Sequence, residues 1–396
     1  MPALLAALAI AACGNVAPDT GVVFRDSAGI QIVENLAPAW AEGEGWQVAG
    51  EPSLDIGTAD GEYAYLFNGV LGAVRLDDGR IVVADGGSAT LRWYDADGTF
   101  LFQRGGLGPG PEEFERLGAP LNSPGPESIV LPSGLDRFSV YDSEGARRDI
   151  RIPRGVRYVE DPVRLPDGSF LAWVGYVGGV PRTPDRFPRI LLRIADDGSA
   201  LDTVATLDGV GQIQADYQAV RGGVSIGARW LHLGPMTDME VVGSEVVLGT
   251  ASDHQVVYMD PTAQVRRIIR WPGPDLVLTA ADRDAFVEWQ VEAARARGVE
   301  DLANLRAMAR ELPLTDRYPA YWGIRADAEG NLWIRDRNEL GQRDERFMVL
   351  DPSGRLLGEV AMPEGFRTLQ IDAHQVLGLW RDDLGVEHIQ VYELLK

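Results

Sequence analysis

The chain has 396 residues, and its 59 acidic residues outnumber its 37 lysines and arginines, which gives a net charge of −22 at pH 7. A surface this acidic repels a phosphate backbone, so a nucleic-acid partner is excluded. Lys396 is the only lysine, which excludes enzymes that need an internal lysine for a Schiff base or a phosphate-binding loop. With 45% apolar and 24% charged residues, the composition is that of a folded globular protein.

The chain opens with a short apolar run that ends in Ile10-Ala11-Ala12-Cys13, and Cys13 is the only cysteine. The run is too short to span a bilayer but has the length of a signal-peptide apolar region. Its end resembles the bacterial lipobox, although no Lys or Arg precedes the run. The resemblance implies that residues 1–20 are a signal segment and linker. A lipid on Cys13 would then anchor the protein in the cell envelope, on the periplasmic side or at the outer membrane, as its only membrane contact. The alternatives are a secreted protein, or a chance cysteine in a cytoplasmic one.

A phrase of two β-rich runs separated by a turn rich in Asp and Gly recurs along the rest of the chain. The turns stand at 95–98, 142–145, 195–198 and 351–354, with a degenerate copy at 260–263. We expect each Asp to bond its own backbone and each Gly to take a positive φ, so these residues are turn formers rather than ligands. Repeats of about 40 to 50 residues that contain several short strands are typical of a β-propeller.

A second turn precedes the first in each unit, and its glycine marks the unit. The steps between these glycines are 46, 43, 75 and 87 residues, from Gly79 through Gly125, Gly168 and Gly243 to Gly330, and a sixth copy follows near Asp372. The spacing predicts six four-stranded antiparallel blades within one domain over 21–396. Only three strands fit in the last unit, so an N-terminal strand is expected to close the ring. The candidates are Ile30–Val33 and Gln47–Ala49.

The two long steps contain insertions. In the second, Thr279 and Asp282 form a helix start signal, and apolar residues then recur every three to four positions up to Leu312. This predicts a helical hairpin over about 279–312, between blades four and five, that caps one face of the ring. Segments 175–188 and 209–234 are rich in Gly and Pro and are predicted to be long loops.

Several stretches together resemble a known family. Val74–Asp85, Leu91–Gly98, Gly105–Phe114, Arg25–Ile30 and Gly330–Ile334 resemble the NHL-repeat pattern, and specifically the six-bladed β-propeller lipoproteins of bacterial cell envelopes. The likeness covers almost the whole chain after the signal segment and is strongest in unit one. Members of this group are largely uncharacterised. The resemblance therefore implies a fold and an envelope location but no reaction.

The Gly-rich segment Gly105–Phe114 connects the first blade to the second, and such connections lie on the face where propellers bind ligands. Arg104, Glu112 and Arg116 are expected to present charge there, beside Phe114. The alternative is a purely structural crossover in which Phe114 plugs the core between the blades.

Four aromatic residues, Trp173, Tyr318, Tyr321 and Trp322, are candidates for a platform that holds a carbohydrate or a peptide. Flat rings give a large contact area at low entropic cost. Tyr321 and Trp322 stand where the first strand of a blade is expected to begin. That position also fits the competing interpretation, in which these rings pack inside the blades.

No coherent catalytic set is evident in the sequence. Gly223-Val224-Ser225-Ile226-Gly227 matches the nucleophile-elbow pattern, but that motif needs a strand-to-helix turn in an α/β sheet. The four histidines have no metal-ligand spacing. Propeller lactonases and hydroxyglycine lyases hold a metal in the central channel with residues from several blades. Asn68, Asp161 and Asp238 are the candidates for such a site.

The sequence therefore predicts an all-β, six-bladed propeller that acts as a binding or interaction module through its loop face. The expected ligand is an unidentified protein, peptide or carbohydrate, and no cofactor is expected. The alternative is a metal-dependent hydrolase or lyase that uses channel carboxylates around a divalent cation. Activity is expected where the repeat is interrupted, at the Gly105–Phe114 crossover, the two long loops and the helical hairpin.

Overall fold

A computed structural model gives the fold of the chain. It describes residues 21–41, 43–110, 112–115, 117–119, 121–122, 129–134, 136–152, 158–175, 185–218, 224–230, 233–312, 314–337, 342 and 344–396. Cys13 and Arg116 lie outside these residues, as do 176–184 and 219–223 within the two predicted loops. Neither helix in the described part of the chain is long and apolar enough to cross a membrane.

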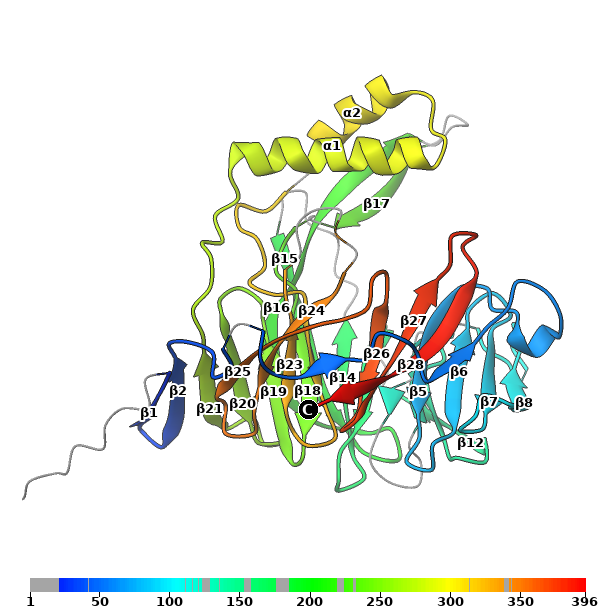
Figure 1. Cartoon of the computed structure of the whole chain (residues 1–396), viewed down its shortest axis with the longest axis horizontal. Helices are drawn as coiled ribbons and strands as arrows, with labels where there is room; N and C mark the ends of the chain where they lie inside the picture. The colour runs from blue at the N-terminus through cyan, green and yellow to red at the C-terminus, as the bar shows by residue number, and fades with distance from the viewer. Residues whose placement is uncertain are drawn as a thin grey trace, which may run out of the picture.

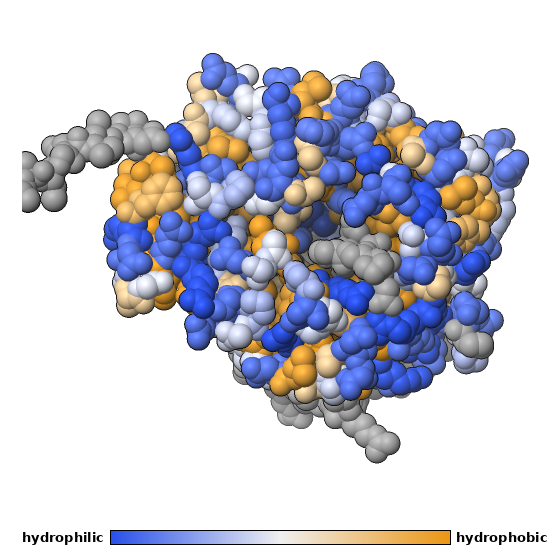
Figure 2. Space-filling model, turned by 90° about the horizontal axis from the view of Figure 1, so that it is seen from below, coloured by the Kyte–Doolittle hydropathy of each residue, from blue (hydrophilic) through white to orange (hydrophobic). Residues whose placement is uncertain are grey.

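Six antiparallel sheets follow one another along the chain and form a ring, with the first strand of each sheet lining the centre. The fold is the six-bladed β-propeller that the repeat predicts, and Figure 1 shows its sheets from the side. Seen from the side opposite to the helices, the surface is largely hydrophilic and is hollowed near its centre (Figure 2).

The strand bounds follow the order of the blades. Blade one contains β5 (Val70–Arg75), β6 (Ile81–Asp85), β7 (Thr90–Tyr94) and β8 (Phe100–Gly105). Blade two contains β9 (Leu121–Asn122), β10 (Ile129–Pro132), β11 (Arg137–Tyr141) and β12 (Arg147–Arg151). Blade three contains β13 (Tyr158–Arg164), β14 (Phe170–Gly175), β15 (Asp185–Ile194), β16 (Ala200–Gln218) and β17 (Val224–Trp230). Blade four contains β18 (Asp238–Val242), β19 (Glu245–Gly249), β20 (Gln255–Met259) and β21 (Val265–Arg270), joined at its edge by β2 (Ile30–Asn35) and β1 (Val22–Ser27). Blade five contains β22 (Gly323–Ala326), β23 (Leu332–Arg335), β24 (Arg346–Leu350) and β25 (Leu356–Ala361). Blade six contains β26 (Arg367–Ile371), β27 (Gln375–Arg381) and β28 (Glu387–Leu395), joined by β3 (Gln47–Val48) and β4 (Leu54–Ile56).

The core lies between neighbouring blades. One apolar cluster joins Tyr94 of blade one to Leu377 and Ile389 of blade six, and equivalent clusters join the other neighbours. The strands that carry these residues are rich in β-branched and aromatic side chains, which suit a pleated surface buried on both faces. Packing of this kind places the six first strands side by side around the channel.

The Asp and Gly residues of the repeat act as turn formers, as predicted. In the turn between β24 and β25, the Asp351 carboxylate accepts hydrogen bonds from the backbone N–H groups of Ser353 and Arg355, and Gly354 has φ +90°. A side chain at Gly354 would also meet Ile269 of the neighbouring blade at 2.7 Å. In the degenerate copy, Ala263 takes φ +66° although it is not a glycine.

The ring is closed by N-terminal residues, but mainly through a strand that the sequence does not predict. β4 pairs with Ile389–Val391 of β28, and β3 pairs with the end of the same strand at Leu394 and Leu395. The Gln47–Ala49 candidate is therefore in place. Leu54–Ile56 escapes prediction because three residues flanked by Ser53 and Gly57 give no periodic signal.

The other closing candidate, Ile30–Val33, is wrong. It lies in β2, which pairs in parallel with β21 at the outer edge of blade four. Asn35 fixes this edge, because its amide donates to the carbonyls of Arg270 and Gly354 and its oxygen accepts from the N–H of Leu356. The N-terminal hairpin therefore bridges blades four and five rather than closing the ring.

Both insertions lie on one face of the ring. α1 (Ala280–Ala296) and α2 (Leu302–Arg310) stand between β21 and β22, and Thr279 and Asp282 form the predicted capping box. The expectation of a long loop over 209–234 is wrong, because β16 runs on to Gln218 and pairs with β17. Glycine content indicates a loop, but a continuous ladder of backbone hydrogen bonds outweighs it here. Figure 1 shows β17 and the two helices together above the ring.

Candidate functional site

A cavity of about 380 Å³ lies at the mouth of the channel on the side that carries the helices. Its walls come from β13 and β15 of blade three, from the starts of β18 and β22 in blades four and five with the residues just before them, and from β10 and the segment before β9 in blade two. The lining residues are Gly118, Ala119, Pro132, Val159, Glu160, Asp161, Arg189, Met236, Thr237, Asp238 and Trp322. Because four successive blades contribute, the cavity exists only in the assembled ring.

Four of the lining residues are charged: Glu160, Asp161, Asp238 and Arg189. The Arg189 guanidinium donates to Glu160 at 3.0 Å and to Asp161 at 3.4 Å through Nη2, and to the carbonyl oxygen of Thr237 at 2.6 Å through Nη1. These contacts tie β15 to the start of β13 and to the residue before β18. The arginine therefore sets the positions of two carboxylates at the mouth.

Trp173 supports Arg189 from behind. Its ring is buried, and the guanidinium carbon of Arg189 lies 4.7 Å from the ring centroid. Trp173 is also the cross-strand partner of Glu160. The prediction that Trp173 forms part of an exposed platform is not met, because the residue instead packs in the core and orients the charged pair.

Asp161 has an unusual backbone conformation for a non-glycine residue, with φ +47°. The register between β13 and β14 shifts between Glu160 and Val163, so a bulge turns Asp161 out of the ladder. Its side chain is 59% exposed, and its carboxylate faces water within the cavity. The side chain reaches water, but the protein around the cavity displaces most of the bulk solvent near the carboxylate. This desolvation, followed by the carboxylates of Asp238 and Glu160, raises its pKa, while Arg189 lowers it.

Tyr321 and Trp322 point in opposite directions, as successive residues of an extended segment do. Tyr321 is fully buried, and its hydroxyl donates to the carbonyl of Gln255 and accepts from the N–H of Ala251. Trp322 is half-buried and lines the cavity. The packing interpretation therefore holds for Tyr321, and the proposed platform is reduced to Trp322.

Trp322 also contacts the two insertions that lie above the ring. It packs against an apolar cluster in which Leu278 and Phe286 come from the helical insertion and Leu233 from the segment after β17. The hydroxyl of Thr315 hydrogen-bonds the carbonyl of Leu233 across the same contact. Both insertions thus meet above the channel mouth, and Trp322 is the residue that joins their core to the cavity.

A second layer of charge lies deeper in the channel. Glu240 follows Asp238 by two residues on β18 and so faces the same side of the strand. Desolvation and the Asp238 carboxylate raise the pKa of Glu240 to about 8, against the opposing effect of Arg325 on β22. Asp238 itself accepts a hydrogen bond from the N–H of Ile324 at 3.1 Å, which joins blades four and five.

The Gly105–Phe114 crossover is folded on itself rather than open. The N–H of Phe114 donates to Gly106, and the Phe114 ring is fully buried beneath the guanidinium of Arg147. Glu112 is exposed, and Arg104 lies exposed on β8 against the ring of Phe102. None of these lines the cavity. The structural alternative is therefore the correct one for Phe114, and the residues of this connection that reach the cavity are Gly118 and Ala119.

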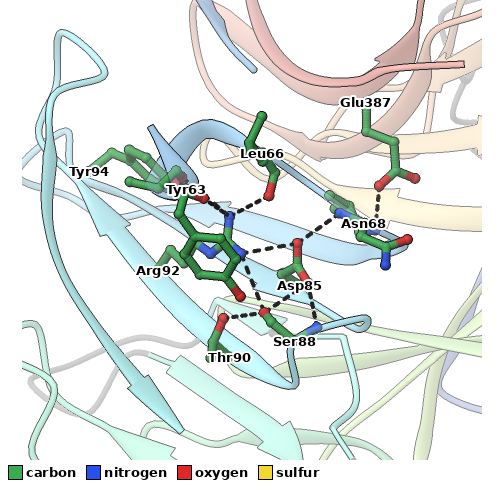
Figure 3. A network of polar contacts seen from close by, with 11 residues as sticks. Tyr63, Leu66, Asn68, Asp85, Ser88, Thr90, Arg92, Tyr94 and Glu387 are labelled. Atoms are coloured by element: carbon green, nitrogen blue, oxygen red, sulfur yellow. Dashed lines mark hydrogen bonds and ion pairs between the residues drawn. The ribbon is translucent and has the colours of Figure 1, made fainter. Parts of the chain in front are cut away.

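Asn68 does not join Asp161 and Asp238. It lies before β5, where its N–H donates to the carboxylate of Asp85 at 2.9 Å. Figure 3 shows Asn68 in the network around Asp85 and Arg92 of blade one, beside Glu387 of blade six. The three residues proposed as metal ligands therefore lie in two separate places. Asn68 lies beside blade one, whereas Asp161 and Asp238 line the cavity. Among the described residues, no group of three or more His, Cys, Asp or Glu side chains is arranged to hold a metal ion.

Comparison with known proteins supports the fold. The chain is similar to a solved member of the DUF4221 family from Bacteroides vulgatus, with a TM-score of 0.53 and 10% identity over 88% of this chain and 98% of that one. It is also similar to a putative exported protein from Bacteroides fragilis, with a TM-score of 0.50 and 12% identity over 92% and 99% of the two chains. No family model matches the sequence. These likenesses, together with the geometry, define the class: a six-bladed β-propeller with a cavity at one mouth.

One curated protein matches part of the sequence. It is a ribose-5-phosphate isomerase A from Jannaschia sp. (strain CCS1), 31% identical over 198 residues. The match covers 45% of this chain, and the chain spans 64% of the length of that protein. A partial likeness of this extent does not assign the whole chain to that protein's family.

Proposed function

We propose that the protein is a binding module whose small ligand, or the side chain of a larger one, enters the cavity at the channel mouth. The observation that carries the proposal is the cavity itself, walled by four successive blades and lined by Glu160, Asp161, Asp238, Arg189 and Trp322. Concave sites with an aromatic wall and a few convergent polar groups are where propellers and other scaffolds recognise ligands. The two insertions above it would control access.

A ligand screen tests this function. The purified protein is heated with a panel of amino acids, amines, sugars, short peptides and nucleosides, and compounds that raise the melting temperature are retained. Trp322→Ala and Asp161→Asn then remove one wall and one charge of the cavity. Trp289→Ala, on the exposed face of α1, is the matched control.

The expected result is at least one compound that stabilises the wild type and the Trp289→Ala control but neither cavity variant. Stabilisation that survives both Trp322→Ala and Asp161→Asn would place the ligand elsewhere. A panel that leaves the melting temperature of the wild type unchanged throughout would count against the binding function.

The proposed location is outside the cytoplasm, with a lipid anchor at Cys13. The support comes from the apolar run before Cys13 and from the description of a structural neighbour as a putative exported protein. Labelling cells with radioactive palmitate tests the anchor. Wild type should incorporate label and Cys13→Ala should not, whereas equal labelling of the two proteins would refute it.

A metal-dependent hydrolase or lyase is the second candidate. The observation in its favour is that Asp161 and Asp238, proposed from the sequence as channel ligands, do line one cavity. Under this function, elemental analysis of purified protein detects a divalent ion that Asp161→Ala and Asp238→Ala both lose. Absence of the ion, with no thermal stabilisation by Ca²⁺ or Zn²⁺, would remove this candidate.

A further inference from the structure

We propose that the cavity binds an organic cation, a primary ammonium or guanidinium group carried on an apolar chain or ring. This inference rests on the proposed binding function and adds the chemical class of the ligand. Three features carry it: the charges of the lining, the contacts of Arg189 and the apolar side chains that also line the cavity.

The lining has more negative than positive charge. Glu160, Asp161 and Asp238 are three carboxylates against the single guanidinium of Arg189, so two negative charges are uncompensated within the cavity. The whole chain adds to this field with its net charge of −22. A concave site of one sign raises the local concentration of ligands of the opposite sign.

Both terminal nitrogens of Arg189 are held by the protein, which makes this side chain a poor site for an anion. Its two terminal nitrogens donate to Glu160, Asp161 and the carbonyl of Thr237, and its face lies against Trp173. Turning toward a ligand carboxylate would break these contacts and leave its partners unpaired. Arg189 therefore acts as a positioning residue for the two acids.

Oxygen atoms of the acids are available to a donor. In the part of the chain that the structure describes, Arg189 is the only side chain that donates to Glu160 or Asp161. An ammonium brings three N–H donors and a guanidinium five, which matches a pair of neighbouring carboxylates. The raised pKa of Asp161 agrees with this, because burial and the nearby carboxylates penalise its charge and a bound cation would relieve it.

The lining also contains apolar side chains, which suit the body of such a ligand. Trp322 is half-buried and Met236 is 43% exposed, and Val159 and Pro132 are further apolar residues of the lining. An indole face attracts a cation as well as an alkyl chain. An inorganic cation would gain nothing from these side chains, whereas an alkylammonium or alkylguanidinium contacts both the carboxylates and the apolar side chains.

Matched probes test the inference. Butylguanidinium and butylammonium are compared with butanol, butyrate and Ca²⁺ by calorimetry or ligand-observed NMR on the full chain. The variants are Asp161→Asn, Asp238→Asn and Trp322→Ala, and Glu359→Gln on the exposed edge strand β25 is the matched carboxylate control. Asp238→Asn keeps one oxygen for the N–H of Ile324, which joins blades four and five, and gives up the local bond from the N–H of Met239.

We expect the two organic cations to bind wild type and Glu359→Gln, and each carboxylate variant to weaken them about tenfold, with further loss as salt rises. If butanol or butyrate binds as tightly as the cations, and Trp322→Ala loses this binding, the cation inference is overturned and the binding function is retained. Ca²⁺ binding that depends on both aspartates would overturn it in favour of the metal site. Failure of every probe and of the ligand panel would overturn both proposals.

Discussion

The carboxylate of Glu387 accepts a hydrogen bond of 2.8 Å from the backbone N–H of Val70, a residue 317 positions earlier in the chain. Glu387 opens β28 and Val70 opens β5, so the bond joins the last blade to the first. Arg381, at the end of β27, pairs with the same carboxylate. Blade five repeats the arrangement, where Glu345 pairs with Arg335 and accepts from the N–H of Thr368 in blade six.

We expect Glu387→Ala to destabilise the fold by about 2 to 4 kcal/mol, because it leaves the N–H of Val70 buried without a partner. Glu387→Gln should cost less, since the amide oxygen still accepts from that N–H. Urea denaturation followed by tryptophan fluorescence measures both. An unchanged midpoint for Glu387→Ala would show that the β3 and β4 strands alone hold the ring closed.

Sequence reasoning recovers the repeated part of the fold because turn chemistry is local. Asp351 and Gly354 form their turn through bonds within five residues, so the pattern is visible without a partner strand. The closure by Leu54–Ile56 and the extension of β16 depend on pairing with distant strands, which no local pattern records.

The candidate site was recovered only in part for the same reason. The sequence predicts Asp161 and Asp238 as parts of a metal site and Trp322 as part of an aromatic platform, and the ring brings the three into one cavity. Glu160 and Arg189 were missed, because Arg189 reaches the mouth only through the pairing of β14 with β15. The sequence does contain a signal for Glu240. It follows Asp238 by two residues on a predicted strand, which places both acids on the same face.

The degenerate turn at 260–263 offers a stabilising change. Ala263 takes φ +66°, a region where the Cβ atom costs energy, and the equivalent positions Gly98, Gly145 and Gly354 are glycines with positive φ. Ala263→Gly should raise the stability by about 0.5 to 1 kcal/mol, the relief of strain exceeding the added chain entropy. A rise in melting temperature is expected, with Gly354→Ala as the opposite control. A lower melting temperature for Ala263→Gly would refute the assignment of strain.

Arg92 holds the loop before blade one to the ring. Its side chain is 1% exposed and lies 3.5 Å from the buried carboxylate of Asp85, and its Nη1 donates to the carbonyls of Tyr63, Ala64 and Leu66 (Figure 3). Arg92→Met keeps the length but removes every donor, which leaves the buried Asp85 carboxylate with hydrogen bonds from Asn68 and Ser88 but without its cationic partner. We expect a loss of about 3 to 5 kcal/mol in the free energy of unfolding and early proteolytic cleavage in this loop.

The control is Arg104→Ala, at an exposed arginine of the same blade. It should change the stability by less than about 0.5 kcal/mol. Equal proteolysis of the two variants would contradict the role given to Arg92.

Glu240 makes the stability of the ring depend on pH. Its folded-state pKa of about 8 lies above the ordinary value of 4.5, so between these values the folded chain binds more protons than the unfolded one. The contribution of Glu240 to the stability is therefore fully present below pH 4.5 and is lost as the pH rises to about 8. Glu240→Gln removes the charge and should raise the free energy of unfolding by about 1 to 3 kcal/mol at pH 9, with little change at pH 5. Urea midpoints of wild type, Glu240→Gln and the exposed control Glu359→Gln at these two pH values measure the effect. If the wild type loses no more stability than Glu240→Gln between pH 5 and pH 9, the prediction is wrong and Arg325 neutralises the Glu240 carboxylate in full.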